Sequence, residues 1–136
     1  MSHFDKVKGY LGELGLAPAS EQGDDELVVV HDEQRGLSHL IVDCDDPILI
    51  LEQFIFALGP EPDPRVLLRL LQMNRSLVHG AFVVDEEGER VLFRDTLQLE
   101  SLDLNELEAS ISSLSLALAE YAGELLSFAK QPAGSE

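Results

Sequence analysis

The spacing of apolar residues near the N-terminus is that of an amphipathic helix. Intervals of three, four and three residues separate Phe4, Val7, Leu11 and Leu14. Residues this far apart share one helix face, so we predict a helix over residues 2–16. Gly15 and Pro18 are expected to end this helix, and residues 17–25 to form a polar loop.

Three runs rich in Val, Ile and Leu follow, at residues 26–31, 37–44 and 48–58. Turn-forming clusters at residues 32–36 and 45–47 separate them, which predicts three strands. Because the connections are short, neighbouring strands are expected to be antiparallel and to form a meander. In the third run, apolar residues occur at both odd and even positions. We therefore expect both faces of this strand to be covered.

A second helix and a hairpin are predicted next. Pro64 suits the first turn of a helix over residues 63–77, where its missing N–H has no cost. The apolar face of this helix is wider than one sheet contact requires and contains Val66, Leu67, Leu70, Leu71, Met73 and Leu77. Two strands at residues 80–85 and 90–99 form the predicted hairpin, with Gly88 in its loop.

A long C-terminal helix has the most regular pattern in the chain. Asp103 and Glu106 have the spacing of a capping box at its start. Intervals of three and four residues separate Leu104, Leu107, Ile111, Leu114, Leu118, Tyr121, Leu125 and Phe128. No residue from 109 to 119 is charged, so we expect another element to cover much of this helix; a solvated, serine-rich face is the alternative.

These elements predict an α+β fold in the order α-β-β-β-α-β-β-α. The 136 residues correspond to one domain, which we place at residues 1–130, followed by a disordered tail at residues 131–136. The fold is thus expected to contain a three-stranded antiparallel meander, a β-hairpin and three helices.

The charge of the chain excludes several classes of partner. A surplus of acidic residues, 26 against 9 basic ones, gives a net charge of -17. Nucleic acid and anionic membranes are therefore not expected as partners, because binding to either depends on Lys and Arg. The charge is -11 over residues 1–63, zero over 64–99 and -6 over 100–136.

No cofactor-binding motif or catalytic set is present, so we expect neither a cofactor nor enzymatic activity. Cys44 is the one cysteine, which excludes an internal disulfide and a thiolate zinc site. His31, His39 and Asp43 could approach one another across neighbouring strands as metal ligands, or be partly exposed strand residues. With no signal-peptide or membrane-spanning pattern, a cytoplasmic protein is expected.

The order of elements resembles that of the Tir chaperone (CesT) family of type III secretion chaperones and of YbjN-like proteins, which share their fold. The resemblance covers about half of the chain by local pattern. It lies in residues 67–74 (LLRLLQMN), 80–88 (GAFVVDEEG), 90–103 (RVLFRDTLQLESLD) and 104–107 (LNEL). These are core and turn residues, so the pattern indicates a fold more specifically than a function.

The resemblance implies a noncatalytic, acidic homodimer that holds an extended segment of a protein client. It implies that the second helix contributes to the dimer interface, through Val66, Leu67, Leu70, Leu71 and Met73. Candidate client-binding residues are Phe4, Leu11, Val28 and Val30; the alternative, which the sequence favours, is that they are ordinary core. A client could also extend the sheet by strand addition. The alternative function is a YbjN-like regulatory or adaptor domain that binds a folded protein, with the acidic surface steering a basic partner.

Overall fold

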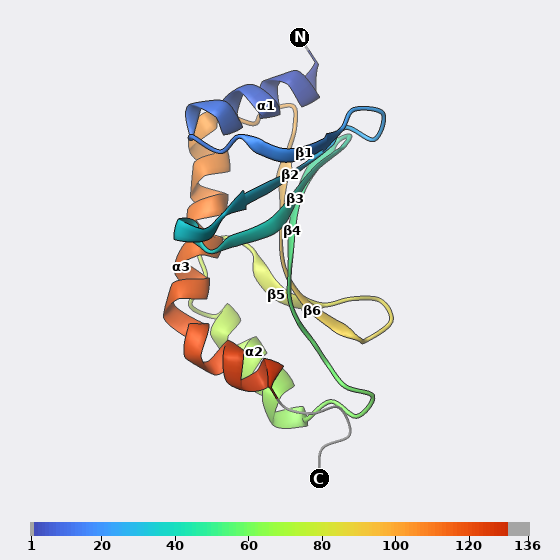
Figure 1. The fold of residues 1–136 in the computed structure, drawn as a ribbon, viewed down its shortest axis with the longest axis vertical. Helices are drawn as coiled ribbons and strands as arrows, with labels where there is room; N and C mark the ends of the chain where they lie inside the picture. Colours follow the sequence, from blue (N-terminus) through green and yellow to red (C-terminus); the bar gives the residue numbers. More distant parts are fainter. Residues whose placement is uncertain (1, 131–136) are drawn as a thin grey trace.

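The computed structural model describes residues 2–130, in which the helices lie on one side of an antiparallel sheet (Figure 1). The helical segments are α1 (His3–Glu13), η1 (Glu33–Arg35, one 3-10 turn), α2 (Pro64–Asn74) and α3 (Leu104–Ala129). Helix α3 runs along the long axis of the molecule, from α1 at one end to α2 at the other. The tail predicted at residues 131–136 lies outside the described residues.

The strands form one sheet in the order β1-β2-β3-β4-β6-β5, with every neighbouring pair antiparallel. They are β1 (Pro18–Gln22), β2 (Leu27–Asp32), β3 (Leu37–Asp45), β4 (Ile48–Ala57), β5 (Ala81–Val84) and β6 (Arg90–Gln98). This arrangement confirms the predicted α+β class and the predicted order of the helices, the meander and the hairpin. It leaves β1 and β5 at the two edges of the sheet.

Strand β1 corrects the prediction of a polar loop over residues 17–25. All five of its side chains are exposed, so the segment has no alternation of apolar and polar residues that would indicate a strand. Its pairing with β2 is irregular between Pro18 and Ser20. Backbone hydrogen bonds to β2, rather than side-chain burial, therefore define this strand, and the sheet has one more strand than the sequence predicts.

The helices begin where the sequence predicts, and α1 and α2 end earlier. Side chains cap all three starts: Ser2 accepts from the Asp5 N–H, Asp63 from Arg65 and Asp103 from Glu106. The predicted helices over residues 2–16 and 63–77 each extend three residues too far. Leu16 and Leu77 nevertheless pack in or against the core, which is why the apolar pattern continues past the helix ends.

The core lies between the helices and the sheet. The apolar seam of α3 faces inward, with Leu107, Ile111, Leu114 and Leu125 buried. On β4 a register shift between Phe54 and Phe56 turns Phe56 into the core and leaves Phe54 50% exposed. The expectation that both faces of this strand are covered was therefore wrong: no helix of residues 2–130 covers the face that carries Phe54.

Candidate protein-binding surfaces

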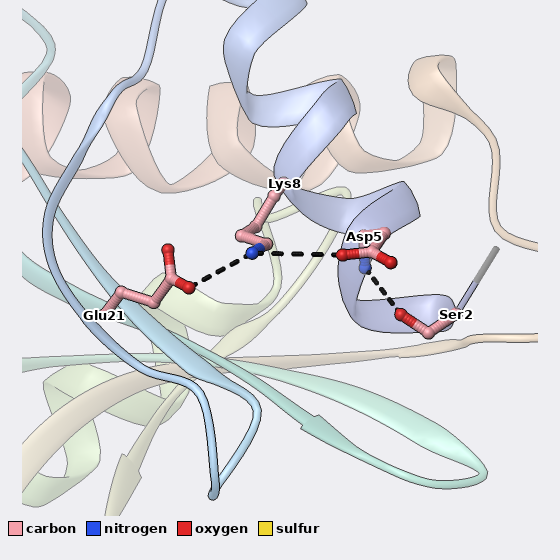
Figure 2. Close-up of polar contacts among 4 residues, drawn as sticks. All are labelled: Ser2, Asp5, Lys8 and Glu21. Carbon is pink, nitrogen blue, oxygen red and sulfur yellow. Dashed lines mark hydrogen bonds and ion pairs between the residues drawn. The ribbon is translucent and has the colours of Figure 1, made fainter.

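Strand β1 lies at an edge of the sheet with all five side chains exposed, and Pro18 is its one residue without an N–H to donate. An ion pair joins the strand to α1, between Lys8 Nζ and Glu21 Oε2, which are 3.1 Å apart (Figure 2). Lys8 also lies 3.9 Å from Asp5 Oδ1 and 4.4 Å from the centre of the Phe4 ring. These contacts orient the strand from one side and leave its outer backbone groups available to another chain.

The edge at β5 is closed at its centre by α2. The side-chain amide of Asn74 donates to the carbonyl oxygen of Phe82 at 3.1 Å, and its oxygen accepts from the N–H of Phe82 at 2.8 Å. Both outward backbone groups of Phe82 are thereby satisfied within the chain. Since β5 has only four residues, this one side chain is enough to obstruct the pairing of another strand.

The four residues predicted to bind a client all lie in the core of the single chain. Phe4 and Leu11 are buried on α1, and Val28 and Val30 on β2. The structure brings them together, within one cluster of packed side chains. They underlie the β1 edge, because Val28 and Val30 belong to the strand that pairs with β1. No part of this set is exposed to an incoming segment.

The five residues predicted at the dimer interface divide into two groups. Val66, Leu70 and Met73 are buried in the core, whereas Leu67 is half-buried and Leu71 is 67% exposed. Leu68, which is absent from the predicted set, is also exposed. The apolar surface that α2 presents to solvent is therefore Leu67, Leu68 and Leu71.

An ion pair links α2 to α3. The guanidinium of Arg69 donates two hydrogen bonds of 2.8 Å to the carboxylate of Glu124 on α3. It also lies 5.6 Å from the centre of the Tyr121 ring. Burial of Val66, Leu70 and Met73 sets the inward face of α2, and Leu68 lies on its exposed side. The sequence alone does not reveal that Arg69 pairs with Glu124, which lies 55 residues further along the chain.

The uncharged stretch of α3 is covered on one side and exposed on the other. Ser110 and Ser113 are buried, and their hydroxyls donate to Asp95 Oδ2 and to the carbonyl oxygen of His79, each at 2.7 Å. Ser115 donates to the carbonyl oxygen of Arg35 at 2.7 Å. Ser112 and Leu116, in contrast, are exposed. The expectation of a covering element is therefore correct for one side of the helix.

Carboxylates gather around Asp43, near the turns that join β1 to β2 and β3 to β4. Burial raises the pKa of Asp43, and the nearby carboxylates of Asp45, Asp25 and Glu52 raise it further. Across β4 and β6, Glu52 accepts a hydrogen bond of 2.7 Å from Arg94. At the hairpin, hydrogen bonding from Arg90 lowers the pKa of Asp85 to about 2. The carboxylates around Asp43 favour the approach of a basic partner to this part of the sheet.

The histidine group predicted as one alternative does not form a metal site in the structure. The rings of His31 and His39 have centroids 5.5 Å apart. Asp43, however, pairs with Leu27 at the opposite end of the same strands. Within residues 2–130, no three His, Cys, Asp or Glu side chains lie close enough together to hold a metal ion. Cys44 is buried, and this burial raises the pKa of its thiol to about 11.

The family model CesT_Tir_1 matches residues 1–131 of the chain. The chain belongs to the CesT_Tir_1 family. Membership confirms the family inferred from the order of elements and, with it, a noncatalytic protein. None of the curated proteins matches the sequence significantly.

Solved structures show the same fold as this CesT_Tir_1 protein at low sequence identity. YbjN from E. coli is 14% identical with a TM-score of 0.68, over 89% of this chain and 92% of YbjN. A chain of the HopA1–SchA chaperone–effector complex is 16% identical with a TM-score of 0.60, over 85% and 91% of the two chains. A chain of the ExoU–SpcU complex from the type III secretion system of Pseudomonas aeruginosa is also 16% identical with a TM-score of 0.60, over 93% and 99%.

No helix in residues 2–130 combines the length and apolar character that a membrane crossing requires.

At identities of 14–16%, the three structural matches establish a secretion-chaperone-like fold for the CesT_Tir_1 chain. They carry no residue-level assignment, because the fold alone does not fix the residues of a binding site.

Proposed function

We propose that this CesT_Tir_1 protein is a cytoplasmic, chaperone-like homodimer that binds an extended segment of a protein client at the β1 edge. The observation that carries the proposal is the contrast between the two edges. All of β1 is exposed, whereas the Asn74 amide occupies the backbone of β5 at Phe82. Strand addition needs an unpaired edge, and β1 is the edge that offers one.

The buried residues under β1 have a supporting role in this proposal. Phe4, Leu11, Val28 and Val30 form the packed layer beneath the edge. They hold the strand to which the client pairs, and the client itself contacts backbone groups and the exposed side chains of β1. The solved complexes of similar fold, one a chaperone–effector complex and one from a type III secretion system, support a protein as the partner.

We also propose that the exposed leucines of α2 form a contact between two copies. Leu67, Leu68 and Leu71 present adjacent apolar side chains on a helix that is anchored to α3 by Arg69. The buried members of the predicted set, Val66, Leu70 and Met73, position this face from inside the chain. An exposed apolar face of this kind is typical of an interaction surface.

The experiment that tests the function is affinity purification of the tagged chain from its native cell, with mass spectrometry and light scattering of the eluate. The proposal predicts one enriched protein bound through an extended segment, and a homodimer in the free protein. A monomer that enriches no protein over an untagged control would contradict it.

An adaptor that binds a folded, basic partner is the second candidate. The net charge of -17 and the cluster around Asp43 favour it. Binding of this kind is electrostatic and therefore falls steeply as salt is raised. Strand addition depends chiefly on backbone hydrogen bonds, so a complex that survives 0.5 M salt, roughly where the screening length falls below 5 Å, favours the first candidate.

A further inference from the structure

The β1 edge of the sheet carries more negative than positive charge. Glu21 on β1 pairs with Lys8 of α1, and the ammonium of Lys8 also lies 3.9 Å from Asp5 Oδ1 (Figure 2). One ammonium therefore stands between two carboxylates. Besides Glu21, residues 19–26 contain three acidic residues and no basic one. An added cation is thus attracted to this edge, and an added anion is repelled from it.

The ammonium of Lys8 is held in place, and Glu21 retains a free oxygen. Lys8 donates to Glu21 Oε2 at 3.1 Å and lies 4.4 Å from the centre of the Phe4 ring, which is buried in the core. Among residues 2–130, Lys8 is the one group that donates to the side chain of Glu21. That side chain is 43% exposed. Glu21 Oε1 is therefore available to a second donor.

A strand added to β1 would place one of its side chains beside Glu21. Residues directly opposite each other in neighbouring strands point to the same face of the sheet, with Cβ atoms about 4.5–5.5 Å apart. Glu21 lies opposite Val28, which is buried on the helix side. The client residue opposite Glu21 therefore also points to the helix side. Client residues opposite Ser20 and Gln22 point to the other face and meet uncharged side chains.

We propose, resting on the proposed strand addition at β1, that Glu21 selects a client segment with lysine or arginine at the position opposite it. The basic side chain of the client binds Glu21 Oε1 from the solvent side, while Lys8 keeps Oε2. An opposite-charge pair directly across two strands changes the affinity by about 1.5- to 5-fold. Lys8 opposes this selection, because its ammonium repels the cation of the client.

Three synthetic peptides test the charge preference. They share the sequence Thr-Val-Thr-Val-X-Val-Thr-Val-Thr, with Lys, Gln or Glu at X, and each carries a fluorescent dye. Fluorescence anisotropy measures their affinity, and hydrogen exchange of residues 19–22 shows whether they bind at β1. We expect the affinity to fall in the order Lys, Gln, Glu. Equal affinities or the reverse order would overturn the selection by Glu21.

Variants of the ion pair distinguish selection from a structural role. Glu21→Gln should reduce the preference for the Lys peptide, whereas Lys8→Gln should increase it. Both variants break the same ion pair, so a merely orienting contact would change the binding of all three peptides alike in both. The matched control is Glu120→Gln, which removes one negative charge from an exposed position beside the segment that follows α2. A preference in Glu21→Gln equal to that in Glu120→Gln would overturn the selection.

The outcomes also separate the selection from the proposed function. If no peptide slows hydrogen exchange at residues 19–22, strand addition at β1 is wrong, and the selection by Glu21 is wrong with it. If all three peptides bind there with equal affinity, strand addition stands and the selection is wrong. In the charge reversal Glu21→Lys, the Glu peptide should bind most tightly. An order of affinities unchanged by this reversal would contradict the selection.

Discussion

The side chain of Asn74 makes with Phe82 the two backbone hydrogen bonds that a neighbouring strand would otherwise make. The amide nitrogen donates to the Phe82 carbonyl oxygen and the amide oxygen accepts from the Phe82 N–H. Through this pair, α2 both packs on β5 and prevents its use as a free edge. The sheet is therefore asymmetric, with β1 left as its open edge.

Replacing Asn74 with Leu should destabilise the fold and open the β5 edge. The variant leaves two partly buried backbone groups of Phe82 without partners, which costs about 1–3 kcal/mol for each buried group. Urea denaturation measures this loss, and light scattering should show increased self-association. Asn105→Leu, at an exposed helical position, is the control. An Asn74→Leu variant as stable and as dispersed as the wild type would mean that the pair is not needed.

The residues predicted for client and dimer contacts should separate by their effect on stability. Leu11→Ala should reduce the free energy of unfolding by about 2–5 kcal/mol, because it leaves a cavity in the core. Leu71→Ala should change the stability of the isolated chain by less than about 0.5 kcal/mol, because its side chain is exposed. Denaturation at low protein concentration measures both. Equal effects of the two variants would contradict the burial of Leu11 and the exposure of Leu71.

Asp85 should contribute to stability only above acidic pH. Its pKa in the folded chain is about 2 because Arg90 donates to its carboxylate, against roughly 3.9 in an unfolded chain. The charged form is thus stabilised by folding, and this contribution is present above pH 3.9 and is lost as pH falls toward 2. The stability difference between wild type and Asp85→Asn should shrink over that range. If the stability difference between the two proteins did not change with pH, Arg90 would not be stabilising the charged carboxylate of Asp85.

Cys44 should be unreactive in the folded protein. Burial raises the pKa of its thiol to about 11, against roughly 8.5 when unfolded. Folding therefore stabilises the neutral thiol, and this contribution is lost as pH rises from 8.5 through 11. A thiol-reactive dye at pH 8 should label the denatured chain quickly and the native chain slowly. Equal labelling rates would contradict a buried, protonated thiol.

The sequence predicts the helices and the buried strands because their stability comes from side chains whose spacing is visible. Phe4, Val7 and Leu11 on α1 are buried as their spacing predicts. Strand β1 could not be predicted, since its exposed side chains carry no pattern. The register shift after Phe54 was also invisible, because alternation continues through it in the sequence. On α2, the outward leucines could not be separated from the buried ones, because the helix is apolar over a face wider than the part that is buried.

The most direct test of client binding at β1 is hydrogen exchange of the protein alone and in complex with its purified client. Strand addition predicts that the backbone amides of residues 19–22 exchange more slowly in the complex, while those of Ala81–Val84 keep their rate. Protection of β5 with no change in β1, or a complex that slows exchange in neither strand, would contradict strand addition at the β1 edge.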